Sequence, residues 1–218
     1  MDCAVFDVDD TLYLEREYVR SGFAAVGTWA RTNVGLVDVE ESAWRAFVGG
    51  QRGRVFDTVL EAHGIRDADL VASMVEVYRR HQPDIALEPD ARRCLEALRP
   101  RMPLAVVTDG PATSQRAKIS ALGLPELASI VVVTDELGPG RGKPHPLAFE
   151  TVEQAIGVDG SRCTYVADNP AKDFAAPRSL GWRTVRVRRA GGLHAAAPSS
   201  DDVDIEVDDL RDLGWADP

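Results

Sequence analysis

The chain has 218 residues, of which 44% are hydrophobic and 28% are charged, and its formal net charge is −10. This length and composition indicate a globular protein with one ordinary domain, or a core domain plus a smaller module. The negative charge argues against nucleic acid or an anionic membrane surface as the main partner.

The first predicted element is an apolar strand that ends in a group of acidic residues. In the stretch AVFDVDDTL, the strand at residues 3–6 is followed by Asp7, Asp9 and Asp10. Carboxylates this close repel one another, and removing them from water costs more still. Either a divalent cation balances them, or the stretch is a solvated turn, for which Asp-Asp-Thr is also suited.

The next region has helical patterns and no convincing strand. Apolar residues recur at helical spacing over residues 15–33, 39–48, 55–62 and 68–80. Turn signals around Pro83 and Pro89 separate these four helices from the rest of the chain. We therefore predict a helical domain at residues 15–88, inserted into a second domain that comprises residues 1–14 and 89–218.

From residue 90 onward helices and short apolar strands alternate. Helices are predicted at 90–98, 112–122, 146–156 and 171–180, and strands at 104–108, 130–133, 163–167 and 183–187, with a further edge strand around 205–207 and a helical turn at 210–213. Such alternation is typical of right-handed crossovers and a parallel sheet. The predicted fold is an α/β, Rossmann-like core with helices on both faces of the sheet, plus the inserted helical domain.

Polar residues follow the predicted strands at the points where ligands bind in open parallel sheets. Each set alone is consistent with an ordinary turn, but together they form a site of carboxylates, a hydroxyl, backbone donors and a lysine. The candidates are Asp7 and Asp9, then Thr108, Asp109 and Gly110, then Lys143, and finally Asp168, Asn169 and Asp173.

In order and spacing these motifs resemble the haloacid dehalogenase superfamily, whose members are mostly magnesium-dependent phosphatases. DVDDT at residue 7 resembles its first motif, Thr108-Asp109-Gly110 the second, Lys143-Pro144 the third, and DNPAKD at residue 168 the fourth. The helical insert resembles the family's C1-type cap. Asp109 departs from the pattern, since many relatives carry Asn there.

The resemblance implies a mechanism in which Asp7 attacks phosphorus to form an aspartyl-phosphate, and Asp9 acts as general acid and base. Mg²⁺ would be bound by Asp7, Asp168 and the backbone carbonyl of Asp9. Asp173 would support the ion directly or through another ligand. The phosphoryl group would be held by the second and third motifs, namely Thr108, Asp109, Gly110 and Lys143.

The expected function is thus a Mg²⁺-dependent phosphatase whose partner is a small phosphorylated metabolite. The alternatives are a 2-haloacid dehalogenase, a phosphomutase, or a binding protein without turnover. Arg20, Arg52 and Arg54 in the cap are candidates for contact with an anionic substrate, but are as readily surface residues.

Other features of the sequence are interpreted more plainly. Lys172 is expected to point outward, and Gln115 and Lys118 to be helix-surface or packing residues. The odd number of cysteines and the absence of a secretory pattern indicate free thiols and a cytoplasmic protein. The expected oligomeric state is a monomer or a homodimer.

Overall fold

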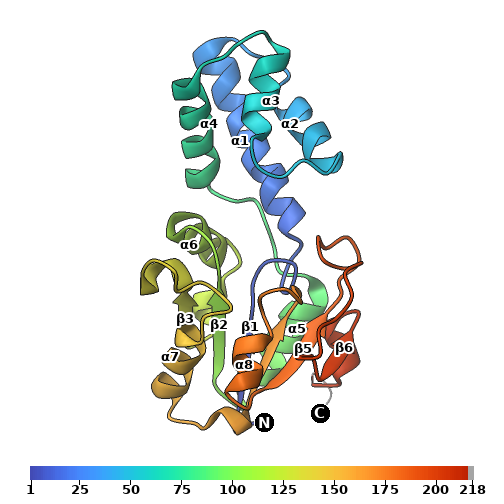
Figure 1. The fold of residues 1–218 in the computed structure, drawn as a ribbon. Helices are drawn as coiled ribbons and strands as arrows, with labels where there is room; N and C mark the ends of the chain where they lie inside the picture. Colours follow the sequence, from blue (N-terminus) through green and yellow to red (C-terminus); the bar gives the residue numbers. More distant parts are fainter. Residues whose placement is uncertain (216–218) are drawn as a thin grey trace. The chain divides into compact units, whose positions relative to one another are not determined.

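The computed structural model describes residues 1–215, and the chain divides into two compact units. One unit joins residues 1–15 to the chain from residue 85 onward, and the other comprises residues 16–84 (Figure 1). We call them the α/β unit and the helical unit. Within the described residues, no helix is both long and apolar enough to cross a membrane.

The α/β unit contains a six-stranded sheet in the order β3-β2-β1-β4-β5-β6, and each neighbouring pair is parallel. Its strands are β1 (Cys3–Phe6), β2 (Leu104–Thr108), β3 (Ile130–Val133), β4 (Cys163–Ala167), β5 (Arg183–Val187) and β6 (Ile205–Val207). The central strands β1, β2 and β4 are fully buried, as expected of a sheet covered on both faces. The predicted Rossmann-like sheet is confirmed.

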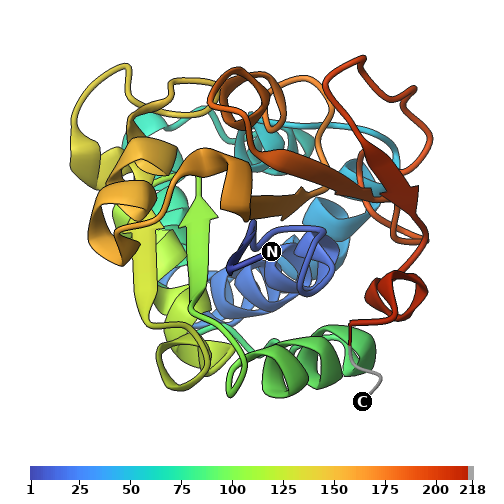
Figure 2. The same cartoon turned by 90° about the horizontal axis from the view of Figure 1, so that it is seen from below.

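Helices cover both faces of the sheet. One face packs on α7 (Leu147–Ile156) and on residues at and before α8 (Ala175–Ser179), around a core that includes Phe149, Tyr165 and Trp182. Right-handed crossovers place α5 (Pro89–Leu98) and α6 (Ala112–Ala121) on the opposite face. Figure 2 shows α5 and α8 on opposite sides of the strands.

The chain order reverses beside β1. β2 and β3 lie on one side of β1, whereas β4, β5 and β6 lie on the other. In the register, Phe6 is opposite Val106 on β2 and opposite Val166 on β4. The residues that follow these three strands therefore come together at one edge, at the type of switch point where open sheets bind ligands.

One predicted helix is much shorter than expected. The pattern predicted a helix over residues 171–180, but α8 spans only Ala175–Ser179. The preceding residues form a turn in which the backbone N–H groups of Lys172 and Asp173 donate to the carbonyl of Asn169. The Asp173 carboxylate in turn accepts from the N–H of Asn169, at 2.9 Å. The local hydrogen bonds of this turn replace the first helical turn.

The helical unit is built from four helices. They are α1 (Glu15–Val34), of which the first residue belongs to the α/β unit, α2 (Val39–Val48), α3 (Val55–Ala62) and α4 (Ala68–Arg80). A stripe of Val19, Phe23, Val26 and Ala30 places one face of α1 in the core of this unit. The helices approach closely at Gly27, where a Cβ atom would lie 2.8 Å from the Cβ of Glu40.

A buried ion pair joins distant parts of the α/β unit. Arg189 donates two hydrogen bonds to the Asp90 carboxylate, at 3.0 and 2.9 Å, and a third to the carbonyl of Thr11, at 2.7 Å. Asp90 also accepts from the N–H of Leu210, at 2.8 Å. The pair thus connects the start of α5, the loop after β1 and the C-terminal turn η4 (Leu210–Leu213).

Candidate active site

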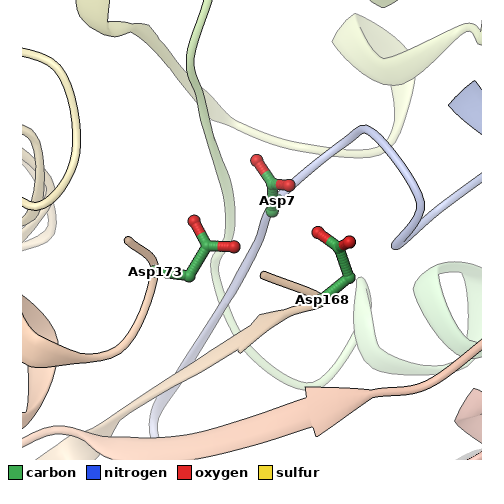
Figure 3. Close-up of side chains that lie close together, drawn as sticks. All are labelled: Asp7, Asp168 and Asp173. Carbon is green, nitrogen blue, oxygen red and sulfur yellow. The ribbon is translucent and has the colours of Figure 1, made fainter. Parts of the chain in front are cut away.

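Three acidic side chains meet at the carboxyl edge of the sheet (Figure 3). Asp7 directly follows β1, Asp168 directly follows the neighbouring strand β4, and Asp173 comes from the turn before α8. One oxygen from each carboxylate lies within 4.8 Å of those from the other two, and all three residues are buried. We call this group the carboxylate cluster.

The carboxylate cluster carries unfavourable electrostatics. Burial raises the pKa of Asp168 to about 9, and repulsion from Asp7 and Asp173 acts in the same direction. Burial also raises the pKa of Asp7 to about 6, although the ammonium group of Lys143 opposes that shift. The ionised forms of these two side chains are therefore disfavoured unless further positive charge is nearby.

Lys143 supplies part of that charge. Its Nζ lies 2.7 Å from an oxygen of Asp7 and 2.7 Å from one of Asp173, and it donates to the hydroxyl of Tyr165 at 3.0 Å. Burial alone would lower the pKa of Lys143, but the two carboxylates more than offset this and raise it well above its usual value. One lysine thus serves two of the three acids.

The donor set of the cluster fits a hard divalent cation. All three ligand groups are carboxylates, which Mg²⁺ and Ca²⁺ prefer. Among residues 1–215, no lysine or arginine forms an ion pair with the side chain of Asp168, so its charge has no partner from the described chain. A cation at this position would balance Asp168 together with the remaining charge of the cluster.

The last residue of β2 and the residues just after it contact α6. The hydroxyl of Thr108 donates to the side-chain oxygen of Gln115, at 3.0 Å. Gly110 has φ +128°, and a Cβ atom there would lie 2.9 Å from the Gln115 amide nitrogen, so the position requires glycine. The structure therefore places Thr108 and Gly110 against α6 at the carboxyl end of β2.

The Asp109 side chain is turned toward the loop that carries Lys143. It accepts hydrogen bonds from the hydroxyl of Thr134 and the N–H of Lys143, and its other oxygen lies 3.2 Å from Nζ of Lys172. Burial would raise the pKa of Asp109, but these partners outweigh it and lower the pKa. Lys172 points toward this edge of the sheet, contrary to the prediction that it faces outward.

Asp9 is surrounded by hydrogen-bond donors. Lys118 Nζ lies 2.7 and 2.8 Å from its two carboxylate oxygens, the Gln115 amide donates to Oδ2 at 3.1 Å, and the hydroxyl of Tyr13 donates to Oδ1. Burial acts to raise the pKa of Asp9, but Lys118 and these hydrogen bonds outweigh it and lower the pKa. We call Asp9, Tyr13, Gln115 and Lys118 the Asp9 network.

Gln115 and Lys118 were expected to be helix-surface or packing residues, and their hydrogen bonds to Asp9 were not predicted. Both are 3% exposed, and both contact Asp9 from α6. A signal was present in the sequence, since positions 115, 118, 119 and 122 form one apolar-facing stripe at helical spacing. A lysine on such a face that does not reach solvent needs a paired group.

The remaining acidic residue of the first motif is structural. Asp10 is 2% exposed, and it accepts from the N–H groups of Glu15 and Leu193, at 2.8 and 2.7 Å. The side chain of Asp10 thus holds the start of α1 and the loop after β5.

The three arginines named as cap candidates have local partners in the helical unit. The guanidinium of Arg20 lies over the ring of Trp44, and that of Arg52 over the ring of Phe47, at 5.0 and 4.1 Å from the centroids. Arg54 lies 3.4 Å from Asp57. Their part in substrate binding remains a prediction.

Known proteins share this sequence pattern and fold. A family model of haloacid dehalogenase-like hydrolases matches residues 1–181. Phosphoserine phosphatase of Thermus thermophilus is 34% identical over 85% of this chain and 71% of its own length. Glyceraldehyde 3-phosphate phosphatase of Methanocaldococcus jannaschii is 27% identical over 96% of this chain and 93% of its own.

Structural similarity points to the same group of proteins. The crystal structure of 2-haloacid dehalogenase from Pseudomonas syringae superposes with a TM-score of 0.67 and 25% identity, covering 99% of this chain and 97% of that one. Relatives of this chain thus include phosphatases and a dehalogenase, two classes of hydrolase on one fold.

Proposed function

Because the chain belongs to the haloacid dehalogenase-like hydrolases, we propose that it is a Mg²⁺-dependent phosphatase of small phosphorylated metabolites. The observation that carries this proposal is the carboxylate cluster, in which three buried acids lie together and Lys143 pairs with only two of them, Asp7 and Asp173. A halide-displacing enzyme has no need for so many oxygen ligands, whereas transfer of a phosphoryl group benefits from a cation beside the nucleophile.

In the first half of the reaction Asp7 is the nucleophile. A carboxylate oxygen of Asp7 forms a bond to phosphorus as the bond from phosphorus to the substrate's alcohol oxygen breaks. Asp9, two residues along the chain, donates a proton to that departing oxygen. This step requires that the negatively charged phosphoryl group raise the pKa of Asp9 from the lowered value it has in this structure. The products are an alcohol and an aspartyl-phosphate on Asp7.

In the second half a water molecule takes the place of the alcohol. Asp9, now a carboxylate, accepts a proton from this water as its oxygen bonds to phosphorus. The bond between phosphorus and the Asp7 oxygen breaks, which releases inorganic phosphate and restores both aspartates. A second carboxyl group such as Asp9 suits this reaction, because the leaving alcohol needs a proton. A leaving halide takes no proton, so halide displacement would not use Asp9 as an acid.

The other residues of the site bind and balance charge. When bound at Asp7, Asp168 and Asp173, Mg²⁺ supplies positive charge that lowers the repulsion between the nucleophile and the phosphoryl group. Lys143 contributes a fixed positive charge, and the N–H of Gly110 offers a hydrogen bond to a phosphoryl oxygen. The Thr108 hydroxyl donates to Gln115 in this structure, so it would have to exchange that partner to bind a phosphoryl oxygen. Asp109 orients the Lys143 loop through its hydrogen bond to the N–H of that residue.

The helical unit is proposed to act as the cap domain predicted at residues 15–88. Caps that close over a site exclude water and contact the leaving group. Phosphate monoesters are the substrates named for two of the relatives, so a small organic phosphate is the substrate class we propose here.

A substrate screen tests the proposal. Phosphate release would be measured with O-phosphoserine, triose and sugar phosphates, polyol phosphates, phosphoglycolate, nucleotides and 4-nitrophenyl phosphate, each with Mg²⁺ and with a chelator. Chloride release from 2-chloropropionate would be measured in parallel. We expect Mg²⁺-dependent phosphate release and no chloride release.

The Asp7→Asn variant is the control for the screen, because an amide is a poor nucleophile. Phosphate release that survives the chelator or this substitution would contradict the proposed mechanism. Chloride release in the absence of phosphate release would instead identify a dehalogenase.

A further inference from the structure

Asp9 is held by two side chains of one helix that the proposed mechanism does not use. Lys118 and Gln115 lie one turn apart on α6, and together they contact both carboxylate oxygens of Asp9. The hydroxyl of Tyr13 adds a donor on Oδ1. Lys118 Nζ lies near both oxygens, so it limits rotation of the carboxylate as well as movement of the side chain.

Gln115 connects this arrangement to the end of β2. Its amide nitrogen donates to the carbonyl of Asp109 at 2.9 Å as well as to Asp9, and its oxygen accepts from Thr108. The missing Cβ at Gly110 leaves room for the amide group. The orientation of Asp9 on one strand end is therefore coupled to the residues that follow the neighbouring strand.

Stability alone does not account for a buried lysine in α6. Lys118 is 3% exposed, and a buried ion pair is frequently no more stabilising than apolar side chains of similar volume. The neighbouring positions Ile119 and Leu122 show that this face of the helix packs well with apolar residues. The ion pair is placed on the one carboxylate that must meet a leaving oxygen in the proposed reaction.

We propose that Lys118 and Gln115 are positioning residues, which hold the Asp9 carboxyl group in the orientation needed to exchange a proton with the leaving oxygen and with water. This inference rests on the proposed phosphatase function. A carboxyl oxygen that meets the leaving group exchanges one of its donors for the substrate, while the remaining contacts keep the group in place. Loss of either residue leaves Asp9 present but free to adopt other rotamers.

Two aryl esters provide the test. 4-Nitrophenyl phosphate has an acidic leaving phenol that departs with little help, whereas phenyl phosphate depends more on protonation of its leaving oxygen. Both kcat and KM would be measured with saturating Mg²⁺ for the wild type, Asp9→Asn, Lys118→Met, Lys118→Arg and Gln115→Leu. Arg116→Met is the matched control, because Arg116 lies on the same helix but pairs with Glu136 at the surface.

A positioning role predicts a dependence on the leaving group. General acid catalysis contributes about 10²- to 10⁴-fold to the rate. In Lys118→Met we expect kcat/KM, which reports the step in which the leaving group departs, to fall about tenfold further for phenyl phosphate than for 4-nitrophenyl phosphate, in the same direction as in Asp9→Asn. KM should change little, Lys118→Arg should recover part of the loss, and Arg116→Met should resemble the wild type.

The outcomes separate this inference from the proposed function. A wild type that cleaves neither ester would overturn both. An active wild type in which Lys118→Met and Gln115→Leu lower kcat/KM equally for the two esters, or behave like Arg116→Met, would overturn the positioning role and leave the phosphatase intact. If Lys118→Met fails to fold, as shown by circular dichroism, the milder Gln115→Leu decides the question by the same ratio.

Discussion

Asp7 and Asp9 are separated by a single residue, yet their carboxylates lie in opposite electrostatic settings. Burial raises the pKa of Asp7 to about 6, and one lysine is shared between it and Asp173. Asp9 is also partly buried, but its own lysine and two further donors lower its pKa. The chain itself thus balances the charge of Asp9. Asp7 and Asp168 need more positive charge than Lys143 supplies.

The contrast between Asp7 and Asp9 shows that one strand end can carry a carboxylate with a raised pKa beside one with a lowered pKa. On the proposed function a bound cation balances the carboxylate cluster, so the stability and the activity of the protein should both depend on that cation. The Asp9 network is complete without it. Four changes to the chain or its conditions test this division, in order of decreasing effect.

Replacing the nucleophile should have the largest effect. In Asp7→Asn we expect kcat to fall by about 10³-fold or more, equivalent to roughly 4 kcal/mol, because the covalent step is lost. The metal-free variant should melt no lower than the wild type, since one charge has been removed from a repulsive cluster. Retention of more than about a tenth of the wild-type rate would rule out Asp7 as nucleophile.

Binding of Mg²⁺ should stabilise the folded protein through the carboxylate cluster. At a hundredfold excess over Kd the gain in unfolding free energy is about 2.7 kcal/mol. Thermal melts across a Mg²⁺ titration should show this gain in the wild type and its loss in Asp168→Ala. The surface variant Glu136→Gln should respond like the wild type, and equal responses in all three proteins would place the ion elsewhere.

The metal-free protein should lose stability as the pH rises. The pKa of Asp168 is raised by burial to about 9 and that of Asp7 to about 6, so above pH 4 the unfolded chain releases these protons before the folded one does. The stability is therefore greatest at low pH and falls between about pH 5 and pH 9. Asp9, whose pKa is lowered, contributes in the opposite sense and only at more acidic pH.

Melting temperatures measured in chelator between pH 5 and pH 9 check this expectation. Asp168→Asn should flatten the slope, because the pKa of Asp168 is raised further than those of Asp7 and Glu15, which also titrate in this range. Glu15, whose pKa burial raises to about 7, adds to the same trend and should leave a residual slope. A wild type that gains stability over this range would contradict the electrostatic description of the cluster.

The smallest effect is expected at Asp109. An asparagine there keeps the oxygen that accepts from Thr134 and from the N–H of Lys143, and loses only the ion pair with the partly exposed Lys172. Such pairs contribute about 0–1 kcal/mol. We expect Asp109→Asn to keep its kcat within roughly fivefold of the wild type, and a larger loss would assign the carboxylate a direct part in the reaction.

Residues that sit at strand ends could be anticipated from the sequence. Asp7 and Asp168 follow buried apolar runs, and parallel pairing brings such ends together whatever the rest of the fold does. A different kind of prediction failed at the turn before α8. Periodicity favoured a helix from residue 171, but a hydrogen bond between the Asp173 side chain and the N–H of Asn169 stabilises a turn there instead. Local pattern cannot weigh those two sets of hydrogen bonds against each other.

Lys118 illustrates a second limit. Its partner Asp9 is 109 positions away, and the side chain of a lysine usually reaches solvent even when its stem is buried. Helical spacing placed position 118 on the packed face of α6, but only the tertiary structure pairs it with Asp9. Long polar side chains that bridge elements are thus the part of a site that sequence patterns predict least.

The buried pair of Asp90 and Arg189 has a consequence for where the chain can be cut. Similarity to the family model ends at residue 181, yet β5, β6 and Arg189 all follow that point. A chain ended there would lose β5, β6 and the guanidinium that pairs with Asp90 at the start of α5. Thr11, on the loop that carries Asp9, would lose the same arginine. We therefore expect residues 182–215 to unfold together with the loop after β1, and the two should exchange their protected amide protons together.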